Sequence, residues 1–143
     1  MKIVSACLVG VNCRFDGKNK ISKGLIEAFK RGKMIPLCSE QLGGLSTPRP
    51  PSRIVDGNGY DVLDGRARVL TQSGEDVTEN FIRGATEVLK IAEVLDVEEA
   101  ILESKSPSCG CGRIYNGHFG ESVERDGVLA ALLRRNGIRA IPG

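Results

Sequence analysis

The chain has 143 residues, of which 41% are hydrophobic and 27% are charged, and these proportions are typical of a soluble globular protein. Twenty basic residues stand against eighteen acidic ones, and the two signs are interspersed along the chain. Length and charge therefore argue against a disordered chain and against extended contacts with nucleic acid, and we expect a single domain over residues 1–143.

The first ten residues contain a short apolar run that predicts a buried strand over residues 2–6. The run follows Lys2 and is broken at Gly10. It is too short for the core of a secretory signal and far below the ~20 apolar residues of a membrane span. We therefore expect a cytoplasmic protein. In that reducing compartment, five cysteines indicate metal binding or catalysis rather than disulfides.

A helix, a second strand and a long loop are predicted next. Apolar residues at helical spacing predict a helix over residues 22–31, and a short apolar run predicts a buried strand over 34–37. From residue 39 to residue 74 the chain is rich in glycine, proline and turn residues, and the short runs 61–63 and 67–70 predict a small hairpin there. A loop of this length in a small domain usually has a function.

The second half of the chain continues the alternation of helix and strand. We predict helices over residues 75–95 and roughly 122–135, and strands over 100–102 and 138–141. Each helix can carry the chain back across a right-handed crossover, so this order predicts parallel strands. The expected fold is α/β and three-layered: a Rossmann-like, mainly parallel four-stranded sheet with a long Gly/Pro-rich loop and a small hairpin.

Three cysteines lie at or near the carboxyl ends of predicted strands. Cys7 follows the first strand, Cys38 follows the second, and Cys109 lies a few residues beyond the third. Because the carboxyl ends of parallel strands share one edge, where ligands bind in α/β folds, these three thiols can meet in space. Cys13 and Cys111 lie in the adjoining loops and are possible additional or spare ligands.

The residues alone leave several uses for such thiols open. Thiolates favour zinc or iron-sulfur clusters. The sequence has one histidine, His118, which is most simply a loop residue, and it has no Cys-x-x-Cys pair, so structural zinc is disfavoured. Buried cysteines also pack as small hydrophobic residues. A redox pair of Cys109 with Cys111 is less favoured, because so short a bridge is strained. A sulfur carrier with one reactive thiol would need no metal.

Five separated segments resemble, in the same order, the thiouracil desulfidase family. They are Ser5-Ala6-Cys7-Leu8-Val9-Gly10, Cys13-Arg14-Phe15-Asp16-Gly17, Pro36-Leu37-Cys38-Ser39-Glu40, the segment 43–51 (Gly-Gly-Leu-Ser-Thr-Pro-Arg-Pro-Pro) and Ser104-Lys105-Ser106-Pro107-Ser108-Cys109-Gly110. The resemblance covers nearly the whole chain. It departs from the family pattern at Ser39, where the family usually has proline, and at Val9, where it usually has leucine.

The resemblance implies an enzyme that removes sulfur from a small thiolated molecule such as thiouracil, by hydrolysis and without redox chemistry. It implies a 4Fe-4S cluster bound by Cys7, Cys38 and Cys109, whose open iron takes the sulfur. The alternatives are a non-catalytic module that binds zinc or another soft metal, and a thiol-based sulfur carrier. The oligomeric state does not follow from the sequence.

The remaining polar groups receive roles in the same reaction. The resemblance favours Glu40 as the base that activates water or as a proton donor. We assign Ser104 to catalysis and Ser106 to substrate binding, because a hydroxyl both donates and accepts hydrogen bonds. Asp16 is expected to support a turn or to line the pocket. Arg49 is assigned, with Asp16, to substrate binding. Held between two prolines, it can present its guanidinium to an anion or to a carboxylate, or it can pin the loop.

Overall fold

A parallel sheet organises the chain, and the computed structural model describes residues 1–115, 122–123 and 125–143. The four strands of the sheet are β1 (Lys2–Ser5), β2 (Met34–Leu37), β5 (Glu99–Leu102) and β8 (Arg139–Pro142). They lie side by side in the order β2-β1-β5-β8, and every pairing is parallel. The predicted α/β fold with a mainly parallel four-stranded sheet is confirmed.

The helices agree with the predicted pattern except at their ends. They are the 3-10 helix η1 (Ala6–Val9), α1 (Lys23–Lys30), α2 (Ser39–Leu42), α3 (Gly59–Leu63), α4 (Thr78–Val94) and α5 (Val128–Arg135). The predicted start of the last helix near residue 122 was wrong. Residues 122–123 form β7 (Ser122–Val123), which pairs with β6 (Ile114–Tyr115), and the extended Gly127 precedes the helix. In the described part of the chain, no helix combines the length and the apolar content that a membrane crossing requires.

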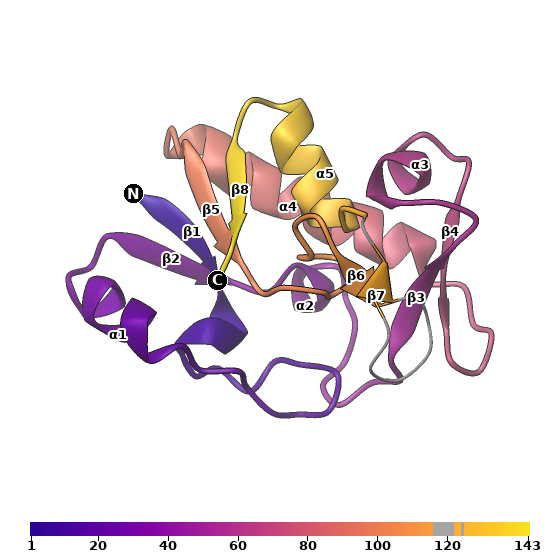
Figure 1. Ribbon diagram of the computed structural model, residues 1–143, viewed down its shortest axis with the longest axis horizontal. Helices are drawn as coiled ribbons and strands as arrows, with labels where there is room; N and C mark the ends of the chain where they lie inside the picture. Colours follow the sequence, from indigo (N-terminus) through magenta and orange to yellow (C-terminus); the bar gives the residue numbers. More distant parts are fainter. Residues whose placement is uncertain (116–121, 124) are drawn as a thin grey trace.

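The two faces of the sheet carry different apolar clusters. Ile3 and Leu102 belong to the larger core, which also contains most of the buried residues of α4 and α5. Their neighbours Val4 and Ile101 belong to a smaller cluster with η1 and the half-buried Leu25 of α1. Because successive side chains of a strand point to opposite faces, helices cover both sides and the fold has three layers, with α4 and α5 on one side of the sheet and α1 on the other (Figure 1).

The small hairpin exists, but its first strand differs from the prediction. Strand β4 (Arg68–Thr71) pairs with β3 (Ser52–Val55), and residues 61–63 instead form part of α3. A capping box explains the error: the Asn58 side chain accepts a hydrogen bond from the Asp61 N–H, and the Asp61 carboxylate accepts one from the Asn58 N–H. These two bonds satisfy donors at the start of a helix and so favour a helical turn there.

Candidate active site

A cavity of about 770 Å³ lies at the carboxyl ends of β1, β2 and β5. Four of the five cysteines line it: Cys7, Cys13, Cys38 and Cys109. The structure therefore brings together the three thiols that the strand order placed at this edge, although 102 positions separate the first from the last in the sequence numbering, since 109 − 7 = 102. All five cysteines of the chain are free thiols.

The backbone fixes each of the three thiols where a strand ends. Cys7 lies in η1, directly after β1, and the turn closes at Gly10, whose φ of +102° favours glycine. Cys38 stands immediately before α2, and the backbone N–H of Gln41 bonds its sulfur. Cys109 lies in the turn after β5, where its N–H donates to the Ser106 hydroxyl at 3.0 Å. Local structure thus presents all three sulfurs to one cavity.

Cys13 is more central than the sequence indicated. Its side chain is only 2% exposed, and its thiol is hydrogen-bonded to those of Cys7 and Cys38. The bond from Cys38 lowers the pKa of Cys13, whereas the bond with Cys7 and burial raise it, with a net result of about 11. Cys111, by contrast, does not line the cavity, and its thiol donates to the Cys109 carbonyl at 3.5 Å.

The sulfurs of Cys38 and Cys109 are held as protonated thiols by their surroundings. The hydrogen bond with Cys13, followed by burial, raises the pKa of Cys38 well above its usual range. Burial raises the pKa of Cys109, and the hydrogen bond from Ser5 opposes that rise. Because metals bind the thiolate, these protons must leave when a metal centre binds.

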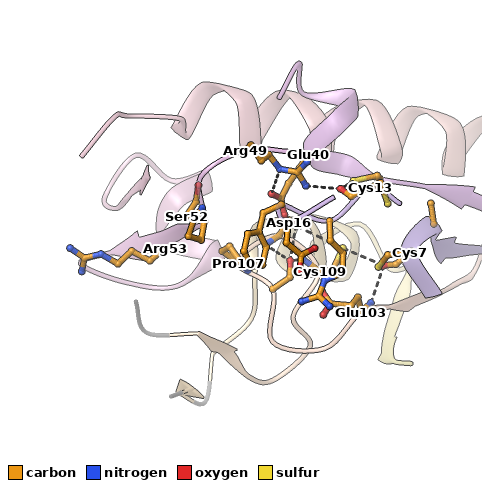
Figure 2. A pocket seen from close by; sticks show the side chains of 18 of the residues that line it. Cys7, Cys13, Asp16, Glu40, Arg49, Ser52, Arg53, Glu103, Pro107 and Cys109 are labelled. Carbon is orange, nitrogen blue, oxygen red and sulfur yellow. Dashed lines mark hydrogen bonds and ion pairs between the residues drawn. The ribbon is translucent and has the colours of Figure 1, made fainter. Parts of the chain in front are cut away.

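Glu40 is one of three carboxylates of the cavity wall, with Asp16 and Glu103, and it is held by two partners. It lies in the first turn of α2, so that the same short helix positions both Glu40 and Cys38. One carboxylate oxygen accepts from Arg49 Nε at 3.1 Å and the other from the Ser108 hydroxyl at 2.7 Å. Figure 2 shows Arg49 and Glu40 joined in this way beside Cys13.

Arg49 uses its guanidinium on protein groups. Besides Glu40, it donates to the Cys13 carbonyl at 2.9 Å, the Ser46 carbonyl at 3.1 Å and the Thr47 hydroxyl at 3.0 Å. Its side chain is 6% exposed. Arg49 thus connects the loop before β3 to Glu40 and to the loop that contains Cys13, and its predicted role in substrate binding stays a prediction.

Two serines form a chain of hydroxyls that ends on Glu40. The Ser106 and Ser108 hydroxyls lie 2.8 Å apart, and Ser106 also accepts from the backbone N–H groups of Ser108 and Cys109. Since the Ser108 proton goes to Glu40, Ser106 donates to Ser108. Ser104 is half-buried and is not among the residues that line the cavity. The serine beside Glu40 is therefore Ser108, which the sequence analysis passed over.

The loop after η1 forms another part of the wall. Asp16 lines the cavity, and its carboxylate also accepts from the Lys18 N–H at 3.0 Å, so it both supports the turn and faces the site. Arg14 stacks its guanidinium 5.8 Å from the centre of the Phe15 ring. Both of these residues line the same cavity. The wall farther from the thiols includes Ser52 of the hairpin.

Sequence reasoning missed two further polar groups, Ser5 and Glu103. Glu103 follows β5, lines the cavity and lies 3.4 Å from the Lys20 ammonium. Burial raises the pKa of Glu103, and Lys20 only partly offsets this effect. No motif marked Glu103, although its place at a strand end was a usable signal. His118, which we expected in a loop, lies outside the described residues.

The donor set fits a cluster better than a single ion. Among the residues that the structure describes, no three or more His, Cys, Asp or Glu side chains are arranged to hold one metal ion. Yet Cys7, Cys38 and Cys109 all line one roomy cavity. An iron-sulfur cluster takes thiolates around an inorganic core rather than around one atom, so separated thiols on a shared cavity suit it.

The chain is similar to known proteins over nearly its whole length. A model of the family described as "2-thiouracil desulfurase" matches residues 3–142. The uncharacterized protein YbbK of Bacillus subtilis (strain 168) is 45% identical over 142 residues, covering 99% of this chain and 94% of its own. The solved structure of the [4Fe-4S]-dependent thiouracil desulfidase TudS has 43% sequence identity to this chain. The match covers 98% of this chain and 88% of the TudS chain, with a TM-score of 0.85.

Proposed function

Because the chain belongs to the 2-thiouracil desulfurase family, we propose that it is a [4Fe-4S]-dependent desulfidase acting on a small thiolated molecule such as thiouracil. The observation that carries the proposal is the meeting of Cys7, Cys38 and Cys109 in one cavity with Glu40. A carboxylate and soft ligands together suit a reaction that must both bind sulfur and activate water.

Cys7, Cys38 and Cys109 are the proposed ligands of the cluster. When bound by three thiolates, a 4Fe-4S cluster supplies an iron with an open coordination position, which acts as a Lewis acid toward sulfur. Cys13 lines the same cavity, and we assign it to the surroundings of the cluster rather than to its ligands.

The proposed reaction exchanges sulfur for oxygen without any change of oxidation state. A water molecule adds its oxygen to the thiocarbonyl carbon and gives up one proton. As the carbon-sulfur bond breaks, the second hydrogen of that water passes to the sulfur, which leaves as hydrosulfide. Glu40 accepts the proton of the attacking water, because its carboxylate lines the cavity beside the proposed ligands. The Ser106–Ser108 chain then gives this proton a path along hydroxyls that already share hydrogen bonds.

Arg49 supports Glu40 in this scheme, and the cavity wall binds the substrate. The guanidinium holds one carboxylate oxygen, so that the Glu40 side chain keeps one orientation. Asp16 and Ser106 line the cavity and are proposed to bind the polar groups of the substrate, Ser106 by redirecting to the substrate the hydrogen that it donates to Ser108. A cytoplasmic location belongs to the same proposal, because a reducing compartment preserves the five free thiols.

Anaerobic reconstitution with iron and sulfide tests the proposal. The wild-type protein is expected to bind about four irons and to release sulfide from 2-thiouracil or 4-thiouracil. Ser variants of Cys7, Cys38 and Cys109 are expected to lose the cluster, and the matched Cys13→Ser variant is expected to keep it. A protein that takes up zinc but no iron, or a holoprotein that leaves both substrates unchanged, would contradict the activity.

A further inference from the structure

The hydroxyl of Ser5, at the end of β1, forms hydrogen bonds with two residues that follow β5, Glu103 and Cys109. Ser5 is the last residue of β1, 3% exposed, and its hydroxyl lies 3.3 Å from Cys109 Sγ. The same oxygen accepts a hydrogen bond from the backbone N–H of Glu103 at 2.9 Å. Both bonds are buried, and they join residues 104 and 98 positions apart.

The partners of Ser5 decide where its proton points. A hydroxyl carries one hydrogen and has lone pairs for acceptance. The Glu103 N–H can only donate, so it occupies the acceptor side of the oxygen. The single Ser5 hydrogen is then directed at Cys109 Sγ, the remaining partner in the structure. The bond is strongest when the sulfur is a thiolate, because hydrogen bonds to charged acceptors are the stronger ones.

We propose that Ser5 is a positioning residue for the iron-sulfur centre, donating an O–H···S hydrogen bond to the Cys109 thiolate that binds it. This inference rests on the proposed function, because it requires Cys109 to be a cluster ligand. The bond fixes the rotamer of Cys109 and draws electron density from its sulfur. Hydrogen bonds to ligand sulfurs are among the factors that set the potential of such clusters, and ligand partners commonly affect affinity or activity by roughly 10- to 100-fold.

Substitutions at Ser5 can test the effect of the hydroxyl separately from the effect of side-chain shape. Threonine keeps the oxygen and its hydrogen, whereas valine has nearly the shape of threonine without them. The Ser5→Thr and Ser5→Val variants therefore carry the same extra bulk at the end of β1 and differ in the O–H group. Ser5→Ala removes the hydroxyl without adding bulk.

A control variant must lose a similar hydrogen bond away from the cavity. The Thr78 hydroxyl accepts from the backbone N–H of Val69 at 2.9 Å, as Ser5 accepts from Glu103. Thr78 is not among the residues that line the cavity. Thr78→Val should therefore lower the thermal stability of the protein and leave the properties of its cluster unchanged.

The deciding measurement is the reduction potential of the reconstituted cluster, followed by electron paramagnetic resonance in a dye-mediated titration. Ser5→Ala and Ser5→Val are expected to have more negative reduction potentials than wild type. Both variants lose the O–H···S hydrogen bond, which stabilises the reduced cluster because that state carries the larger negative charge. Ser5→Thr and Thr78→Val are expected to titrate like wild type. Equal potentials in Ser5→Thr and Ser5→Val would overturn the inference.

Iron retention provides a second reading if a variant folds but holds its cluster weakly. During incubation with an iron chelator, Ser5→Ala and Ser5→Val are expected to lose iron faster than Ser5→Thr. Equal rates of iron loss from all three variants would contradict a role for the Ser5 hydroxyl in holding the cluster. Failure of the proposed function is recognised separately, since the wild-type protein in the same experiment would then hold no cluster or release no sulfide.

Discussion

Two glutamates stand at the two ends of strand β5, and they differ in the charges around them. Both are buried, with 8% of Glu99 and 6% of Glu103 exposed. Glu99 begins the strand and pairs with Lys2 at 2.7 Å and with Arg139, whereas Glu103 follows the strand and pairs with Lys20 at 3.4 Å. Lys2 and then Arg139 lower the pKa of Glu99, whereas burial raises the pKa of Glu103.

The two edges of the sheet therefore carry different groups. At the amino edge the charge of Glu99 is neutralised by two cations whose side chains are largely exposed, and ion pairs of this kind contribute little to stability. At the carboxyl edge, Glu40 and Glu103 share a cavity with four thiols, and burial strengthens each electrostatic interaction. Perturbed groups gathered in a cavity are typical of functional sites.

Of the changes at the carboxyl edge of the sheet, removing the charge of Glu40 should have the largest effect on activity. Glu40→Gln keeps the shape of the side chain but removes the base, so desulfurisation should fall roughly 100- to 10,000-fold. The iron content of the holoprotein should stay that of wild type, because Glu40 is not a proposed ligand. Sulfide release within a few-fold of wild type would show that another group accepts the proton.

Substitutions of Ser108 and Ser104, two serines of the same motif, should change the rate less than the loss of Glu40 and should differ from each other. Ser108→Ala breaks the bond to Glu40, and we expect a decrease in kcat of roughly 10- to 100-fold. Ser104→Ala is the matched control, because Ser104 does not line the cavity, and it should leave the rate nearly unchanged. The reverse pattern, with Ser104 needed and Ser108 dispensable, would support the assignment of Ser104 to catalysis that the sequence suggested.

The support beneath the carboxyl edge can be tested through helix packing. A Cβ atom at Gly84 of α4 would lie too close to the Ser39 carbonyl of α2, a backbone atom that cannot turn away. Gly84→Ala should therefore displace α2 or destabilise the protein by about 1–3 kcal/mol. Chemical denaturation measures the loss. Gly24→Ala is the control, because Gly24 lies at an exposed position of α1 where a Cβ atom would meet no atom within 4 Å, and equal effects would argue against the packing explanation.

The pH dependence of stability compares the two glutamates directly and should give the smallest effect. The folded pKa of Glu103 is raised, so its contribution to stability is present below the unfolded value near 4.5 and is lost as pH rises through the folded value. The folded pKa of Glu99 is lowered, so its contribution is present above that unfolded value and is lost as pH falls.

Thermal melts of two amide variants between pH 3 and 8 test these opposite slopes. Relative to wild type, Glu103→Gln should gain stability as the pH rises, and Glu99→Gln should lose it. Each difference should amount to no more than a few degrees. If the melting temperatures of both variants, relative to wild type, changed with pH in the same direction, the pKa values of Glu99 and Glu103 would not be shifted in opposite directions.

Much of the fold could be predicted because local patterns and the final structure agree. Short apolar runs gave the four parallel strands, and the strand-end rule placed Cys7, Cys38 and Cys109 together. The hairpin was mistaken because the capping box of Asn58 and Asp61 overrides the strand-like residues that follow it. Pattern reasoning weighs apolar residues and misses such side-chain bonds to the backbone.

Choosing among neighbouring polar residues needed the structure itself. Ser104, Ser106 and Ser108 have the same functional group, and the direction of each depends on the turn after β5. In that turn Lys105 has a φ of +72°, a conformation that sequence does not reveal for lysine. The roles of Ser5 and Glu103 depend on contacts between separate strands, which a linear motif does not record.

The hairpin of β3 and β4 belongs to a different sheet from the one that carries the thiols, yet Ser52, Arg53 and Gln72 line the same cavity. Substitutions in this hairpin can change which molecules the enzyme accepts without disturbing the residues that perform the chemistry. Such modularity would let relatives diverge in what they process while inheriting one unchanged reaction centre, and engineered libraries confined to the hairpin would exploit the same freedom.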